Sequence, residues 1–187
     1  AMWRHVFTPN VRDHGFAALR VLVKLPAILA DLGIGVLLYA IVRRFASTGY
    51  ALGAAALYLL NPATIYISAA WGQVDSVAGG LALLAIYALL RSSDEAPQSR
   101  AQLLWIVGAW LAFGYSLLIK PQAAVLLPLL VAFAFVDPTR RRERVVATAA
   151  GMGAALILAV LVAEPFHPSN PVAALHWLWD RYAYGAG

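Results

Sequence analysis

Six apolar runs, separated by short polar segments, limit what this chain can fold into. They cover residues 25–42, 51–68, 74–90, 103–119, 122–136 and 145–163. A helix of about 20 residues crosses the roughly 30 Å of hydrocarbon in a bilayer, so most runs suit one crossing each. The apolar residues are continuous, whereas the strands of a membrane barrel alternate with a period of two. The sequence therefore predicts an all-α fold, a polytopic transmembrane helix bundle of about six spans.

The amino-acid composition agrees with an integral membrane protein. Hydrophobic residues fill 62% of the 187 positions and charged residues 12%, about half the charged share of soluble domains. The mean hydropathy is +0.74, and together these values exclude a water-soluble domain. The chain has no cysteine, and its four histidines lack ligand spacing, so we expect no disulfide and no metal site built from these residues.

Basic residues are concentrated in three short segments between the apolar runs. Eight of the 14 lysines and arginines lie there: Arg43, Arg44, Arg91, Arg100, Arg140, Arg141, Arg142 and Arg144. Short basic loops stay on the cytoplasmic side of a membrane, so these segments predict the orientation. No aromatic or glycine residues are interleaved with the arginines, which disfavours a nucleic-acid partner despite the net charge of +5. The opposite helix ends are expected to face outward.

This orientation divides the chain into three parts. Residues 1–24 are expected to form an outer-side amphipathic segment, and residues 25–163 the transmembrane bundle. Residues 164–187, rich in tryptophan and tyrosine, are expected to form an outer-side interfacial segment. An outer segment that begins with four basic residues opposes the charge rule for a first span. We therefore expect further spans before residue 1 and more chain after residue 187, in the same protein or from a partner chain.

Prolines interrupt two of the predicted helices. Asn61-Pro62 breaks the second run, and Pro121 and Pro128 lie at the start and middle of the short run 122–136. Proline removes a backbone donor and bends a helix, which membrane proteins tolerate where neighbours or water satisfy the freed groups. We expect short or broken helices at the outer face, beside a polar cavity.

Polar residues gather at the run ends that this topology places outside. They are Lys24, Asn61, Trp71, Gln73, Asp75, Lys120 and Gln122. Asp75 could cap a helix, or it could bind a substrate together with Trp71 and Gln73. Lys120 could extend its ammonium toward the membrane surface, or it could bind a phosphate as one of the few cations on this side. For both residues we favour substrate binding.

Asp31 lies about two helical turns inside the first run. A carboxylate at that depth is costly unless it is paired, hydrated or protonated. Lys24 is seven residues away on the same helix face, which makes a direct pair doubtful. A partner on another helix, or the protonated form, is therefore required, and Asp31 stays a candidate for catalysis as well as for structure.

These residues, in this order, resemble a polyprenyl-phosphate-sugar-dependent glycosyltransferase of the GT-C type, in the bacterial mannosyltransferase-like branch. The resemblance covers nearly the whole chain. It is carried by Lys24-Leu25-Pro26 with Asp31, by Leu60-Asn61-Pro62 followed by Trp71-Gly72-Gln73-Val74-Asp75-Ser76, and by Lys120-Pro121-Gln122 with Pro128.

The resemblance implies transfer of a sugar, expected to be mannose, from a polyprenyl-phosphate carrier to an acceptor on the outer side of a bacterial plasma membrane. Lys24 and Lys120 would then hold the phosphate. Asp75, Gln73 and Trp71 would hold the sugar or the acceptor by hydrogen bonds and ring stacking. The family's catalytic aspartate is expected in a first outer loop that this chain lacks, so the base is unassigned. No cofactor is expected, a divalent metal stays open, and membrane lipids are the other partners.

Two other functions use the same features. A transporter or flippase-like module would also line its path with broken helices, but its inverted repeats are not visible in the sequence. A structural subunit of a larger membrane complex would explain the glycines that pack helices, but not the polar residues at the outer ends. A cofactor-binding protein is the least favoured, because no histidine or cysteine lies within the runs.

The chain of 187 residues is expected to lack transferase activity on its own, because the family's base lies outside it. The measurement is release of sugar from a polyprenyl-phosphate sugar by the purified, detergent-solubilised chain. Turnover above the rate of a protein-free blank would contradict this expectation.

Overall fold

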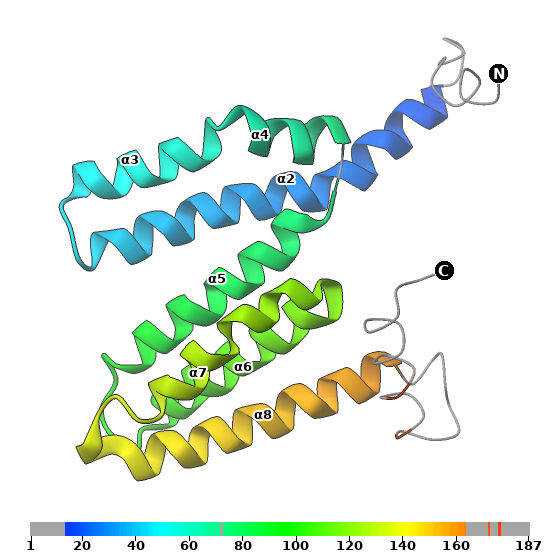
Figure 1. The fold of residues 1–187 in the computed structure, drawn as a ribbon. Coiled ribbons are helices and arrows are strands. Elements are labelled where there is room, and N and C mark those ends of the chain that lie inside the picture. Colours follow the sequence, from blue (N-terminus) through cyan, green and yellow to red (C-terminus); the bar gives the residue numbers. More distant parts are fainter. Residues whose placement is uncertain (1–13, 72, 164–171, 173–175, 177–187) are drawn as a thin grey trace.

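The computed structural model describes residues 14–71, 73–163, 172 and 176, apart from the side chains of residues 14–21 and 69–71 (Figure 1). Within that part, all regular elements are helices: α2 (His14–Arg43), α3 (Thr48–Leu59), α4 (Pro62–Ile65), η1 (Tyr66–Trp71), α5 (Asp75–Ser92), α6 (Arg100–Ile119), η2 (Pro121–Leu126), α7 (Leu127–Phe133), η3 (Pro138–Arg140) and α8 (Arg141–Ala163). The all-α prediction is confirmed. The predicted segments 1–24 and 164–187 lie largely outside the described residues.

Four helical stretches are long and apolar enough to cross a membrane: Leu22–Arg43, Asp75–Ser92, Arg100–Ile119 and Pro138–Ala163. A fifth candidate is the pair Thr48–Leu59 and Pro62–Ser68, bent by 45° at the predicted Asn61-Pro62 break. The predicted number of about six spans is not confirmed. The remaining run, 122–136, forms the shorter helical stretch Pro121–Phe133, which begins as a 3₁₀ helix at Pro121.

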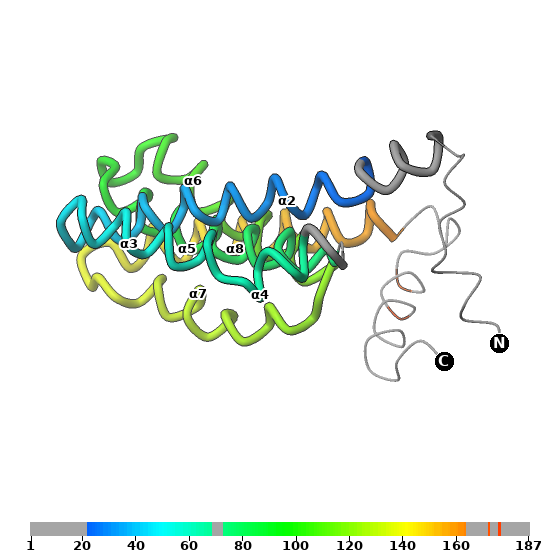
Figure 2. Tube along the Cα trace, turned by 90° about the horizontal axis from the view of Figure 1, so that it is seen from above, coloured from blue at the N-terminus to red at the C-terminus, as the bar shows by residue number. Residues whose placement is uncertain are grey.

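Helix α5 occupies the middle of the bundle. It contacts α2 on one side and α6 on the other, while α3 packs on α2 and α8 packs on α6 (Figure 1). A perpendicular view shows α7 on one side of the group formed by α2, α3, α5 and α8 (Figure 2). The turns 44–47, 93–99 and 134–140, which contain the arginines or adjoin the helix ends that contain them, lie at one end of the bundle, which we call the arginine end (Figure 1).

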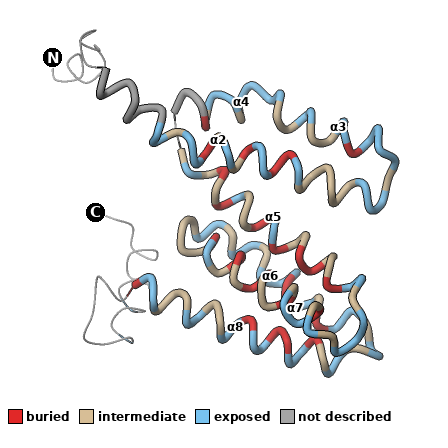
Figure 3. Tube along the Cα trace, turned by 180° about the vertical axis from the view of Figure 1, so that it is seen from behind, coloured by how far each residue is buried: buried red, intermediate tan, exposed pale blue. Residues whose placement is uncertain are grey.

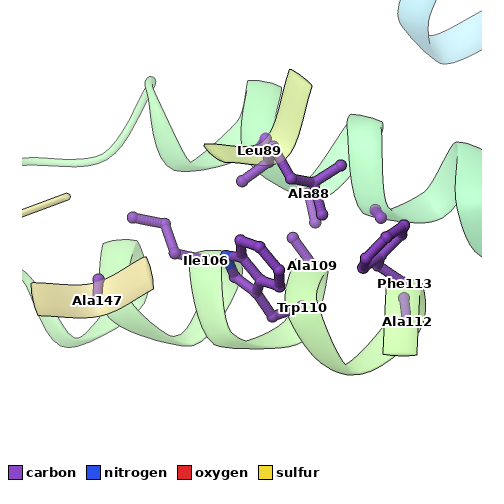
Figure 4. Packing of buried hydrophobic residues seen from close by; sticks show 10 residues of the cluster. Ala88, Leu89, Ile106, Ala109, Trp110, Ala112, Phe113 and Ala147 are labelled. Carbon is purple, nitrogen blue, oxygen red and sulfur yellow. The ribbon is translucent and has the colours of Figure 1, made fainter. Parts of the chain in front are cut away.

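The core between α5, α6 and α8 combines a few large side chains with many alanines. Trp110, Ile106 and Phe113 of α6 are almost fully buried, and they face Ala88 and Leu89 of α5 (Figure 4). Trp110 and Phe113 meet edge to face, with ring centroids 5.8 Å apart. Small residues let membrane helices approach closely, so van der Waals contact can hold them together without a hydrophobic driving force.

Buried positions follow the facing sides of the helices, and exposed positions cover the outside (Figure 3). Many of the exposed side chains are large and apolar, among them Leu57, Leu104, Val125 and Leu161. A water-soluble monomer rarely exposes such continuous apolar surface. Lipid chains around the bundle account for it.

Ion pairs fasten the arginine end. Arg44, in the turn after α2, makes two hydrogen bonds to Asp94 of 2.6 and 2.7 Å and a third to the Leu90 carbonyl. The guanidinium hydrogen bond holds the pKa of the Asp94 carboxyl below its ordinary value. Glu143 of α8 accepts hydrogen bonds from the backbone and side-chain nitrogens of Gln98. The predicted basic segments therefore lie together at one end and are tied to their neighbours.

A close approach of α8 to α6 at Gly151 gives a test of this packing. A Cβ added at Gly151 would lie 2.6 Å from Cδ1 and 2.8 Å from Cβ of Trp110, whereas one added at Gly153 meets nothing within 4 Å. Gly151→Ala should lower the free energy of unfolding by about 1–3 kcal/mol through overpacking. Gly153→Ala is the matched control, and it should keep or raise stability because alanine favours helix by about 1 kcal/mol over glycine. Equal thermal midpoints of the two variants in detergent would contradict the close approach.

Candidate functional site

Three predicted site residues meet at the end of the bundle opposite the arginine end, which we call the Lys120 end. Asp75 is the first residue of α5, Lys120 directly follows α6, and Gln122 lies in η2. Proline disfavours helical backbone in the residue before it, so Pro121 forces Lys120 into an extended conformation with φ −145° and ψ 124°. Helix α6 therefore ends here, and its last side chain turns toward the start of α5.

Lys120 and Asp75 form an ion pair between Nζ and Oδ1, with 33% and 42% of the two side chains exposed. One turn below, Ser116 Oγ donates a buried hydrogen bond of 2.7 Å to the Ala78 carbonyl, which fixes α6 against α5. Val74 is the N-cap of α5, and it makes no side-chain cap hydrogen bond. Asp75 thus lies in the first turn, where the helix dipole favours a carboxylate, but its partner is Lys120.

A pocket of about 370 Å³, the Lys120 pocket, opens between α5, α6 and η2. Its polar lining comes from Asp75, Ser116, Lys120 and Gln122, and its other walls are apolar: Ala78, Gly79, Ala82, Ala123, Val125 and Leu126. An ammonium group paired with a carboxylate, an amide and a hydroxyl beside apolar walls suit a ligand with a polar, hydrogen-bonding head and a hydrocarbon part.

A second pocket of about 410 Å³, the Tyr58 pocket, lies on the other side of α5. Hydroxyl groups line it from Tyr58, Thr64, Ser68 and Ser76, and Asp75 lines it as well. Asp75 and Gly79 belong to the walls of both pockets. Asp75 therefore stands between a pocket with an ammonium group and a pocket with hydroxyl groups.

Asp31 has a hydrogen-bond partner on another helix, as its predicted depth in the membrane requires. Its side chain, 7% exposed, accepts a 2.7 Å hydrogen bond from the Tyr58 hydroxyl of α3. Nearby, the Ser68 and Ser76 hydroxyls lie 2.9 Å apart and share a hydrogen bond. Tyr58 thus lies near both aspartates: it donates a hydrogen bond to Asp31, and it lines the same pocket as Asp75.

Sequence reasoning missed Tyr58, Thr64 and Ser68 as site residues. The sequence feature that could have pointed to them is the buried position of Asp31, which requires a hydrogen-bond partner on another helix. Tyrosine, serine and threonine within apolar runs supply hydrogen bonds between membrane helices, so they were the candidates to examine.

The other predicted site residues do not join these pockets. Asn61 Oδ1 accepts a 2.9 Å hydrogen bond from the Ala63 amide, so Asn61 caps α4 at the bend, and its side chain is exposed. Gln73 is half-buried, and its backbone N–H donates to the Ile67 carbonyl. Lys24 lies half-buried on α2. These three residues line neither pocket, and the side chain of Trp71 lies outside the described residues.

The described residues contain no group of three histidine or acidic side chains that could hold a metal ion. What the Lys120 end offers is hydrogen bonding and charge: one ammonium, one carboxylate, an amide and several hydroxyl groups.

Removal of the Tyr58 hydroxyl tests the pairing with Asp31. Tyr58→Phe should lower the free energy of unfolding by about 1–3 kcal/mol, because a buried carboxylate loses a hydrogen-bond donor. Tyr50→Phe, at an exposed position of the same helix α3, is the matched control and should change stability little. Asp31→Asn in the Tyr58→Phe background should recover part of the loss. Thermal unfolding in detergent measures all three, and similar losses in the two tyrosine variants would contradict the pairing.

The comparison with known families agrees with the resemblance drawn from the sequence. The sequence profile of the dolichyl-phosphate-mannose-protein mannosyltransferases matches residues 16–165, most of the chain and all of its candidate spans. No curated protein and no solved structure matches the chain. The matched region includes Asp31, Tyr58, Asp75 and Lys120. The chain belongs to the dolichyl-phosphate-mannose-protein mannosyltransferase family of membrane glycosyltransferases.

Proposed function

We propose that this chain forms part of an integral membrane glycosyltransferase that transfers mannose from a polyprenyl-phosphate carrier to an acceptor on the outer side of the membrane. The observation that carries the proposal is the Lys120 pocket, where a cation and an amide stand beside apolar walls in a member of a mannosyltransferase family. In the proposed orientation, the Lys120 end faces outward and the arginine end faces the cytoplasm.

Lys120 is the proposed contact for the carrier phosphate. An ammonium group has three donor hydrogens, and the ion pair with Asp75 uses one direction, so the others are free to reach phosphate oxygens. The Gln122 amide lines the same pocket and can donate a further hydrogen bond. In transfer from a lipid phosphate, negative charge grows on the departing phosphate, and fixed donors there stabilise the transition state.

The apolar walls suit the start of the polyprenyl chain. Ala123, Val125 and Leu126 of η2 line the pocket, and Val125 is 78% exposed, facing the surroundings of the bundle. A carrier with its phosphate at Lys120 can therefore leave the pocket along η2 into the lipid phase. Its hydrocarbon never has to cross the polar part of the site.

Asp75 and the Tyr58 pocket are the proposed contacts for the mannose or the acceptor. The hydroxyl groups of Tyr58, Thr64 and Ser68 line this pocket, and carboxylate and hydroxyl groups suit the hydroxyls of a sugar. Lys24, Asn61, Gln73 and Trp71 stay proposed substrate contacts from the family resemblance.

The proton acceptor of an inverting transfer must be a carboxylate beside the acceptor hydroxyl. Asp75 is paired with Lys120, and Asp31 is buried and holds Tyr58. We therefore assign the base to a carboxylate outside the described residues. The proposal requires no cofactor from the described residues, and any divalent metal would need ligands from elsewhere.

Two variants at the Lys120 end test the proposal by donor binding. Lys120→Met should weaken binding of both polyprenyl-phosphate mannose and sugar-free polyprenyl phosphate about tenfold or more, because a charge-assisted contact to phosphate is lost. Asp75→Asn should weaken mannose-donor binding more than binding of the sugar-free lipid, because the amide is uncharged and keeps one acceptor oxygen for sugar hydroxyls where the carboxylate has two.

Arg43→Met, which removes the same charge at the exposed arginine end, is the matched control and should bind both ligands as the unchanged chain does. The measurement is equilibrium binding to the detergent-solubilised chain, with thermal unfolding to confirm that each variant is folded. Equal binding by Lys120→Met and Arg43→Met would overturn the assignment of the phosphate site.

A further inference from the structure

Two arginines at the arginine end differ from the other six. Arg43, Arg44, Arg91, Arg140, Arg141 and Arg144 each make a hydrogen bond, an ion pair or a ring contact. Arg144 is also buried, with only 5% of its surface exposed. Arg100 and Arg142 are exposed, and neither makes any such contact to another described residue. Both of these two arginines line one pocket.

This pocket, the Arg100 pocket, has a volume of about 400 Å³ and lies between the starts of α6 and α8. Besides the two arginines, it is lined by Gln98, Ser99, Gln102, Leu103, Glu143, Val146 and Ala147. It is at the opposite end of the bundle from the Lys120 pocket (Figure 1). It shares no residue with that site.

The polar groups of the Arg100 pocket favour an anion. Gln102 is 3% exposed, and its side-chain Nε2 has no hydrogen-bond partner among the described residues. The Glu143 carboxylate already accepts from the Gln98 backbone and side chain, at 3.1 and 3.0 Å. The start of α6 adds the positive end of its helix dipole. Two guanidinium groups and a buried amide N–H can thus donate hydrogen bonds to a ligand. The one carboxylate of the pocket already accepts hydrogen bonds from Gln98.

The wall of the pocket that lies further from the arginine end is apolar, and it continues onto the lipid-facing surface. Leu103 is 44% exposed and Val146 63% exposed, one turn further into α6 and α8 than Arg100 and Arg142. A soluble phosphate would leave this apolar surface uncovered. A membrane lipid has its charged headgroup at the membrane surface and its acyl chains further in, which matches the arginines followed by the apolar wall. Basic pockets between membrane helices recognise such headgroups.

We propose that the Arg100 pocket binds an anionic glycerophospholipid, with the headgroup phosphate between Arg100 and Arg142 and the acyl chains along Leu103 and Val146. The site is separate from the sugar donor site, and it does not depend on which end of the bundle faces the cytoplasm. A bound lipid would contact the starts of both α6 and α8.

The test is thermal unfolding of the purified chain in detergent, titrated with dioleoylphosphatidylglycerol, dioleoylphosphatidylcholine or inorganic phosphate. Phosphatidylglycerol should raise the unfolding midpoint, and the other two should not at equal concentration. Arg100→Gln/Arg142→Gln should require about tenfold more phosphatidylglycerol, or more, for the same rise. Arg43→Gln/Arg141→Gln is the matched control, because it removes two charges from the same end without touching the pocket, and it should respond as the unchanged chain does.

A variant that is expected to bind the lipid more tightly distinguishes an effect on binding from a loss of folding. Glu143→Gln removes the negative charge from the pocket, so it should lower the phosphatidylglycerol concentration needed for half of the rise. An equal rise with phosphatidylcholine, or a full rise with inorganic phosphate alone, would overturn the proposal. So would a response of Arg100→Gln/Arg142→Gln that matches its control.

Discussion

Close packing along α5 determines where the candidate site residues lie. Ala78, Ala82, Ala85 and Ala88 are buried and recur at helical spacing, so α6 approaches α5 along its whole length. On the other side, a Cβ at Gly80 would lie only 3.3 Å from Ile34 of α2, so α2 is close as well. With both neighbours held near, the first turn of α5 brings Asp75 within reach of Lys120 and beside the Tyr58 pocket. In a bilayer, where helices gain nothing from leaving water, such contacts and a few hydrogen bonds must hold the arrangement.

The sequence was sufficient for the helices, because unbroken apolar runs have one stable backbone form in lipid. It was also sufficient for the bend at Asn61-Pro62 and for the gathering of Asp75, Lys120 and Gln122 at one end, because helix direction alternates from span to span. It was not sufficient for the run 122–136. A mostly apolar run of fifteen positions suggested a crossing, but Pro121 and Pro128 shorten the regular helix, which lies beside α5 and α6.

Side-chain partners depend on the rotation of each helix about its axis, which apolar runs do not encode. Asp31 needed a partner on another helix, and the run that holds it has little periodicity to show which face it presents. The structure turns it toward Tyr58. Asp75 and Lys120 were expected at the same face as separate ligand contacts, and their pairing follows from the end of α6 at Pro121. The side chain of Asn61, predicted as a ligand contact, accepts a hydrogen bond from the Ala63 N–H and caps its own helix, and its contact with a substrate stays a prediction.

The ion pair at the Lys120 end also bears on the state of the site between substrates. A lone ammonium at the rim of a membrane would hold water or a stray anion when no carrier is present. Asp75 is the counter-ion of Lys120, so the pair carries no net charge. In the proposed reaction, an arriving phosphate shares the ammonium with this carboxylate, and a departing one leaves the pair to close again. In that reaction, release of the spent carrier leaves the ammonium paired with Asp75, so an anionic lipid can bind to the pocket and leave it without exposing an unpaired charge.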